Sequence, residues 1–247
     1  MLEFNVSGCT ERSAVKIFAL SDLHLGFDSA KPMDIFGPHW KDHPERIRQA
    51  WIEAVGQDDI VLVPGDISWA MKLEEAERDM AFLRDLPGTK IIIKGNHDYW
   101  WTGLTKLKSS LPPSIIPLQN TAFVSGKVGI AGTRLWIDPD LRLEQSTEQD
   151  LKIFERELGR LQNSLKHLPH GLGMRIIMTH FPPIALDGRV GRAVQAAEKY
   201  GCDIWVFGHM HLFDNDYQGF NRTIGRTRFE FVSADYLDFR PKLILEE

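Results

Sequence analysis

Five short segments of this 247-residue chain concentrate side chains that can bind metal ions. Each follows a run of apolar residues, and together they provide two aspartates, one asparagine and four histidines as potential ligands, with a fifth histidine left over. The segments are Asp22-Leu23-His24, Gly65-Asp66, Gly95-Asn96-His97-Asp98, His180 and Gly208-His209-Met210-His211. Imidazole nitrogens combined with carboxylate and amide oxygens suit manganese, iron, zinc or cobalt.

This inventory is sufficient for two adjacent divalent cations that share one carboxylate. Asp66 is the candidate for the shared ligand because its carboxylate has two oxygens, and Gly65 before it lets the chain turn tightly. Two cations about 3.5–4 Å apart can hold a hydroxide and stabilise both oxygens of an in-line displacement at phosphorus. The residues therefore predict hydrolysis of a phosphate ester, and the fifth histidine remains for proton transfer.

Buried strands alternating with helices are predicted to position these ligands. Short apolar runs predict strands at 15–20, 60–63, 91–93, 175–178 and 204–207. Amphipathic helices are predicted at 44–54 and 74–86, and the longest helix begins at Ser146, which has a capping-box spacing to Gln149. Open α/β folds bind their ligands at the carboxyl ends of strands, so we expect the five segments to converge on one crevice.

The remaining sequence predicts how the sheets are arranged. Residues 121–136 and 217–245 are rich in short strands and glycines, which predicts two mixed sheets packed together with helices outside. With no linker or repeat between them, residues 1–247 are expected to form one domain. The apolar stripe of the longest helix is under three heptads long, which favours packing on a sheet over a dimer seam, although an oligomer stays open. The stripe comprises Leu151, Phe154, Leu158, Leu161, Leu165 and Leu168.

Composition narrows the class of protein. The net charge of −5 and the pI of about 6.0 give no overall basic field, so strong non-specific nucleic-acid binding is not expected. No apolar run reaches the ~18 residues of a membrane span. Cys9 and Cys202 are too few for a disulfide framework. The stretch 6–9 resembles a lipoprotein cleavage box, but only five residues precede it, so a cytoplasmic location is expected.

The series of motifs resembles the calcineurin-like metallophosphoesterase superfamily from Asp22 to His211, and the whole chain resembles a bacterial phosphohydrolase branch of it whose substrate is open. The resemblance implies a four-layer α/β/β/α sandwich of two mixed β-sheets flanked by helices. It implies that one metal is held by Asp22, His24 and His211, that the other is held by Asn96, His180 and His209, and that Asp66 bridges them. It also implies that His97 lies over the substrate phosphate and assists the leaving group, while Asp98 orients His97 by a hydrogen bond.

Three features around these motifs allow two interpretations each. The irregular segment 27–43 is either a lid or substrate wall or a surface excursion packed by its own aromatics, and its His39 and His43 are not expected as ligands. The aromatic residues near the Asp66 and Asn96 loops either stack on a base or pack beneath the loops; they are Trp69, Tyr99, Trp100 and Trp101. Three arginines either bind phosphate or lie on the solvated surface; they are Arg134, Arg189 and Arg192.

The function predicted from the sequence is metal-dependent hydrolysis of a phosphomonoester or phosphodiester by a hydroxide held between two metals. The substrate is expected to be a small phosphorylated molecule, with a nucleotide among the candidates. The alternative is a non-enzymatic metal-binding scaffold for protein interactions on the same fold. Such a scaffold should lack part of the ligand set or the acid histidine, and this chain lacks neither.

Overall fold

Two β-sheets form the centre of the protein in a computed structural model that describes residues 14–29, 31–142, 145–211 and 217–246. The first sheet has the order β11 (Lys242–Glu246), β1 (Lys16–Ala19), β2 (Ile60–Val63), β3 (Thr89–Ile92) and β4 (Ile115–Pro117). The second has the order β5 (Ala122–Ser125), β6 (Val128–Thr133), β7 (Met174–Thr179), β8 (Ile204–Phe207), β10 (Thr227–Phe231) and β9 (Arg222–Ile224). The inner strands of both sheets are parallel, whereas β11, β5 and β9 pair antiparallel, so both sheets are mixed as predicted.

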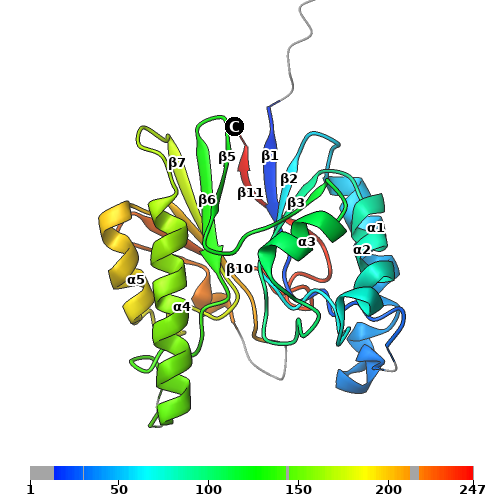
Figure 1. Ribbon diagram of the computed structural model, residues 1–247, viewed down its shortest axis with the longest axis horizontal. Coiled ribbons are helices and arrows are strands. Elements are labelled where there is room, and N and C mark those ends of the chain that lie inside the picture. The colour runs from blue at the N-terminus through cyan, green and yellow to red at the C-terminus, as the bar shows by residue number, and fades with distance from the viewer. Residues whose placement is uncertain (1–13, 30, 143–144, 212–216, 247) are drawn as a thin grey trace, which may run out of the picture.

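Helices cover the outer side of each sheet (Figure 1). The five-stranded sheet is covered by α1 (His43–Ala54), α2 (Glu77–Asp85) and α3 (Leu104–Ser110), and the six-stranded sheet by α4 (Glu148–Lys166) and α5 (Arg192–Ala197). Short 3-10 turns occur at Met33–Phe36, Pro38–Trp40, Leu73–Ala76, Glu198–Tyr200 and Gln218–Phe220. The predicted α/β sandwich of two mixed sheets flanked by helices is confirmed.

Three apolar layers explain why the strands read as continuous apolar runs. Along β1, Ile17 and Ala19 point into the layer between the sheets, while Phe18 points into the layer under α1 and α2. The layer between the sheets also contains Leu62 and Ile176, one from each sheet. Because helices cover the outer faces, both faces of each inner strand are buried, and the polar–apolar alternation of a half-exposed strand is absent there.

The apolar stripe of α4 packs on the six-stranded sheet, as the sequence favoured over a dimer seam. Phe154, Leu158, Leu161 and Leu165 are buried in one cluster with Trp205 of β8. Among the described residues, no helix is both long and apolar enough to cross a membrane. Cys202 is a buried thiol, whereas Cys9 and the stretch 6–9 lie outside the described residues.

Two predicted boundaries differ from the structure. The predicted helix 74–86 is a 3-10 turn over Leu73–Ala76 followed by α2. The capping box of α4 uses Thr147 and Asp150, one residue later than the predicted Ser146 and Gln149. Tertiary contacts set this register, because the Asp150 carboxylate also accepts hydrogen bonds from Trp136 Nε1 at 3.0 Å and Arg142 Nη1 at 3.1 Å.

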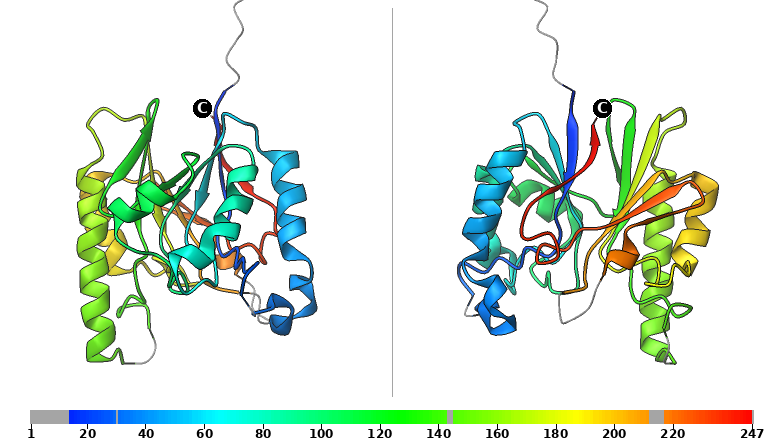
Figure 2. Two further views of the ribbon diagram at one scale, coloured as in Figure 1. Left: turned by 45° about the vertical axis from the view of Figure 1, so that its right-hand side comes forward. Right: turned by 180° about the vertical axis from the view of Figure 1, so that it is seen from behind.

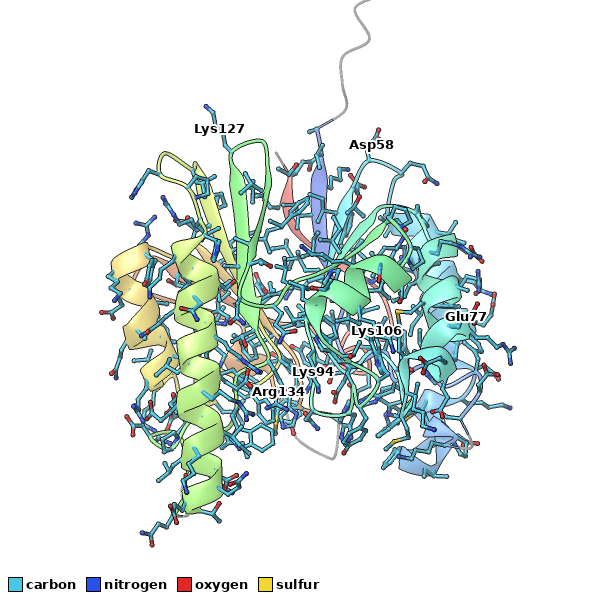
Figure 3. The ribbon with its side chains drawn as sticks, in the orientation of Figure 1. Asp58, Glu77, Lys94, Lys106, Lys127 and Arg134 are labelled. Carbon is cyan, nitrogen blue, oxygen red and sulfur yellow. The ribbon has the colours of Figure 1, made fainter. Side chains whose placement is uncertain are left out.

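The parallel strands direct their carboxyl ends to one edge of the sandwich. Figure 2 shows the beginning of β1 and the end of β11 together at the opposite edge. In Figure 3, Asp58 and Lys127, which precede β2 and β6, lie at that opposite edge, whereas Lys94 and Arg134, which follow β3 and β6, lie at the carboxyl edge. Each predicted ligand segment follows one of these strands, so the fold brings them to the same edge.

The capping box of α4 gives a test of the observed register. Thr147→Ala removes the side-chain oxygen that accepts from Asp150 N at 3.1 Å. Loss of such a cap costs about 1 kcal/mol, so we expect that decrease in the free energy of unfolding, measured by urea denaturation. Ser146→Ala is the matched control, because the Ser146 hydroxyl has no hydrogen-bond partner among the described residues. A larger decrease in the free energy of unfolding for Ser146→Ala than for Thr147→Ala would favour the register predicted from the sequence.

Candidate metal centre

Four of the predicted ligands have an uncommon backbone conformation. The φ angles are +58° at Asp22, +43° at His24, +51° at Asp66 and +77° at His209. Non-glycine residues in this left-handed region cost on the order of 1–3 kcal/mol each and cluster at functional sites. The strand-end loops therefore turn sharply at the residues whose side chains must face one point.

The loops after β1 and β2 are tied to each other by backbone hydrogen bonds. Asp22 N donates to Gly65 O and His24 N donates to Asp66 O, each at 3.0 Å. The loop after β3 joins them because His97 N donates to Asp66 Oδ1 at 2.8 Å. These bonds position the three segments relative to one another without using the atoms that face the centre.

Two glycines allow the loops to approach this closely. A Cβ at Gly95 would collide with the backbone nitrogen and carboxylate of Asp66, and a Cβ at Gly208 would collide with the carboxylate of Asp22. The close approach at Gly208 also allows the next residue to hold Asp22, because His209 N donates to Asp22 Oδ2 at 2.9 Å. The glycines in the Gly-Asn-His-Asp and Gly-His-Met-His segments are therefore required by close packing.

Asp22, His24 and His211 form the first group of potential ligands. Their nearest ligand atoms all lie within 4.8 Å of one another. His24 Nε2 and His211 Nε2 are 3.1 Å apart. Asp22 is fully buried, and its Oδ1 has no hydrogen-bond partner among the described residues. A buried carboxylate oxygen that accepts no hydrogen bond is suited to binding a cation.

Asp66, His180 and His209 form the second group, also within 4.8 Å. Asn96 adds an amide oxygen, since its Oδ1 lies 2.7 Å from His180 Nε2. His180 Nδ1 lies 2.9 Å from the carbonyl oxygen of Pro64, which requires the proton to be on Nδ1. His180 Nε2 is thereby directed at the centre, as is typical of metal-binding histidines.

The Asp66 carboxylate lies between the two groups. Its Oδ2 is 3.8 Å from His24 Nε2 and 3.4 Å from His180 Nε2. Only 1% of Asp66 is exposed to solvent. The geometry therefore places one buried carboxylate oxygen beside a histidine of each group.

Burial and mutual charge shift the pKa values of these residues in opposite directions. Burial raises the pKa of Asp22. Burial would also raise the pKa of Asp66, but His180 holds it well below its usual range. Burial lowers the pKa of His180, yet the carboxylates of Asp66 and Asp22 outweigh it and raise the pKa to about 9. Burial, followed by the neighbouring His180, lowers the pKa of His209 to about 3. Two buried carboxylates surrounded by imidazoles are the kind of environment that divalent cations stabilise.

His97 belongs to neither group. Its half-buried ring lies 4.6 Å from the ring of Trp69 and 5.8 Å from that of His24, measured between centroids. Burial lowers the pKa of His97. The imidazole is therefore placed beside the centre with a nitrogen available for hydrogen bonding to a substrate.

The observed contacts of Asp98 differ from the predicted one. Its buried carboxylate accepts hydrogen bonds from Ile67 N, Ser68 N, Gly95 N and Trp100 Nε1 at 2.7–3.2 Å. Within the described part of the chain, these four bonds do not include the ring of His97. Burial and the charge of Asp66 raise the pKa of Asp98 to about 6, against the effect of these donors. Asp98 thus fastens the Asp66 loop to the Asn96 loop instead of orienting His97.

Two residues near the centre were missed by the sequence analysis. Ser233 Oγ donates to Asp22 Oδ2 at 2.9 Å, and Asp235 Oδ1 lies 3.3 Å from His211 Nδ1. Both follow β10, which pairs parallel with β8. The rule that located the other segments, polar residues at the carboxyl end of a parallel strand, would have found them if β10 had been recognised as such a strand.

Segment 27–43 packs its aromatic side chains against the candidate ligands. The edge of the buried Trp40 ring contacts His24 and His211, with centroids 5.9 and 5.6 Å apart. His43 places its two ring nitrogens 3.1 and 3.3 Å from the carbonyl oxygens of Trp40 and His24. Neither His39 nor His43 falls in a ligand group among the described residues.

Among the other aromatic residues near the centre, the tryptophans pack against it or beneath its loops, and the three arginines form ion pairs. Trp69 stacks on His24 at 4.7 Å, and Trp100 and Trp101 are buried beneath the loops, whereas Tyr99 is exposed. The three arginines all pair with carboxylates: Arg134 with Glu157 at 3.3 Å, Arg189 with Asp187 at 2.8 Å and Arg192 with Glu155 at 2.6 Å.

Comparison with known proteins agrees with this site. The family model for calcineurin-like phosphoesterases matches residues 15–213, and the chain belongs to that family. It is 36% identical over 83 residues to the Gene 66 protein of Mycobacterium phage D29 and 33% identical over 78 residues to that of Mycobacterium phage L5. These stretches cover 33% and 32% of this chain but only 40% and 37% of the phage proteins.

Solved structures share the fold over nearly the full chain. Phosphopantetheinyl hydrolase from Mycobacterium tuberculosis is 14% identical, with a TM-score of 0.55, and the match covers 95% of this chain and 97% of that one. A protein of unknown function from Aquifex aeolicus is 16% identical, with a TM-score of 0.52, and the match covers 93% and 95%. At these identities the likeness shows the fold alone. The chain therefore belongs to a family that is named for phosphoesterases, as the sequence predicted.

Replacing Asp98 tests its role as the tie between loops. Asp98→Ala leaves three buried amides and one indole without their acceptor. Because each unsatisfied buried donor costs about 1–3 kcal/mol, we expect the free energy of unfolding of chelator-treated protein to fall by about 3 kcal/mol. Asp85→Ala, at an exposed ion pair with Arg84, should change it by less than about 0.5 kcal/mol. Equal effects of the two substitutions would contradict this role.

Proposed function

We propose that the chain hydrolyses a phosphate ester at a centre of two divalent cations. The observation that carries this proposal is the position of Asp66 Oδ2, within 4 Å of a histidine from each ligand group. Asp22, His24 and His211 would hold one ion, Asn96, His180 and His209 the other, and Asp66 would bridge them. Manganese, iron, zinc and cobalt all suit these ligands.

When both ions are bound, they supply a hydroxide at neutral pH and offset the charge that develops on the phosphate. The residues of the chain orient this chemistry. Ser233 and the backbone of His209 hold one oxygen of Asp22, which leaves Oδ1 free to face the centre. His97 would donate a hydrogen bond or a proton to the leaving oxygen.

The substrate class is a small phosphorylated molecule, either a phosphomonoester or a phosphodiester. The solved relative that is named a phosphopantetheinyl hydrolase supports phosphate-ester chemistry on this fold. A nucleotide substrate, a single domain over residues 1–247, oligomer formation and a cytoplasmic location stay predictions.

A substrate panel tests the proposed function directly. Protein loaded separately with manganese, iron, zinc or cobalt should hydrolyse at least one ester in a set of phosphomonoesters, phosphodiesters and nucleotides. Released phosphate or alcohol is measured, with Asp66→Asn as the inactive reference. No turnover above that reference with any metal, in protein that contains the full metal complement, would contradict the proposal.

The role of His97 can be separated from metal binding. His97→Ala should keep the metals, because His97 belongs to neither ligand group. We expect its turnover of an alkyl phosphate ester to fall about 10²–10⁴-fold, the usual contribution of a general acid. The loss on an aryl ester with a good leaving group should be smaller, because that oxygen needs less stabilisation.

His39→Ala is the matched control, a histidine close to Trp40 but outside both ligand groups. It should retain metal content and the turnover of both esters. Equal losses of His97→Ala on both esters would mean that His97 positions the phosphate and does not assist the leaving group. A larger loss of turnover for His39→Ala than for His97→Ala would indicate that the general acid lies in segment 27–43.

A further inference from the structure

An apolar cavity opens beside His97. Its volume is about 220 Å³, and it is lined by Met33, Phe36, Trp40, Trp69 and the three histidines His24, His97 and His211. Segment 27–43 provides Met33, Phe36 and Trp40, so it forms part of the wall of this cavity.

We propose that this cavity is the subsite for the leaving group of the substrate and that it takes an uncharged apolar or aromatic group of one or two rings. The proposal rests on the proposed phosphate-ester chemistry, and it adds the chemical class of the group that leaves. It follows from the position of the cavity, the chemistry of its walls and its size.

The position of the cavity connects it to the reacting atoms. His24 and His211 belong to the first ligand group, and His97 is the histidine left for the leaving oxygen. All three rings line the cavity. A phosphate held at the centre with its leaving oxygen towards His97 would therefore direct the remainder of the leaving group into this space.

Apart from three imidazoles and two indoles, the described walls offer no polar side chain to a charged or hydroxylated group. No lysine, arginine, aspartate or glutamate is among the described lining residues. The indole N–H of Trp69 is already used, since Nε1 donates to Met33 Sδ at 3.1 Å. Lys31 lies over the Trp69 ring, but it lines a separate hollow with Asp28 and Asp79. A group with many polar atoms would regain few of the hydrogen bonds that it loses with water here, which is unfavourable, whereas an apolar group gains by burial.

The size and rigidity of the cavity restrict what can enter. It is smaller than the roughly 300–1,000 Å³ of sites for drug-sized ligands. Trp40 and Trp69 are buried and packed against His24, so these two walls are fixed. Phe36 is 42% exposed and lies at the end of the turn Met33–Phe36, which makes it the wall that can be changed without disturbing the core.

Phe36→Ala tests the proposal through substrate preference. The probes are 2-naphthyl phosphate and glycerol 2-phosphate, together with their methyl diesters. We expect the ratio of kcat/KM for the naphthyl over the glyceryl ester to fall about tenfold, as for the loss of an apolar contact in a specificity pocket. Phe36→Leu should retain most of the ratio. Ile35→Ala is the matched control, because Ile35 is 71% exposed in the same turn and does not line the cavity.

A binding measurement separates this proposal from the proposed function. Ligand-observed NMR should show that 2-naphthol binds the metal-loaded protein and the Ile35→Ala variant equally, and the Phe36→Ala variant several-fold more weakly. This binding result would support the subsite even if no ester were hydrolysed. A lack of hydrolysis would instead contradict the proposed function. An unchanged kcat/KM ratio in Phe36→Ala, or equal binding of 2-naphthol by all three proteins, would overturn the subsite.

Discussion

Two carboxylates that are removed from water impose the main constraint on this structure. Asp22 and Asp66 are 0% and 1% exposed and lie where the strands of both sheets end. A buried anion is strongly unfavourable unless it is paired with positive charge. Histidines surround them, and among the described residues neither carboxylate forms an ion pair with a lysine or an arginine. Burial keeps the pKa values of His24 and His209 low. His180 and His211, whose pKa values the neighbouring carboxylates raise against the effect of burial, offset part of this negative charge, and bound cations would offset the rest.

The rest of the site follows from this constraint. Left-handed turns at four ligand positions and the missing Cβ atoms of Gly95 and Gly208 let the loops close around the centre. Asp98 fastens two of these loops to each other. Ser233 holds the carboxylate of Asp22, and Asp235 holds the imidazole of His211. Trp40 and Trp69 pack against the ligand histidines on the remaining side and form two walls of the apolar cavity, so ligand support and substrate selection use the same side chains.

The sequence predicted the elements that obey a local rule. Continuous apolar runs located β1, β2, β3, β7 and β8, and the rule that ligands follow parallel strands brought all seven predicted ligands to one edge. Prediction from the sequence failed where long-range contacts determine the structure. The register of α4 depends on hydrogen bonds from Trp136 and Arg142 to Asp150. Two of the four partners of Asp98 lie in a loop about thirty residues earlier in the chain. The cavity beside His97 could not be predicted either, because its walls come from five separate segments.

The number of metal ions per chain tests the central claim most directly. Protein purified without chelator and saturated with manganese should contain two ions per chain by inductively coupled plasma mass spectrometry. Asp66→Asn should lose most of both ions, because Asp66 is the ligand shared by the two sites, whereas His209→Ala should keep nearly one. A stoichiometry of one ion in the unaltered protein that does not rise with added manganese, or an Asp66→Asn variant that keeps both ions, would contradict the account.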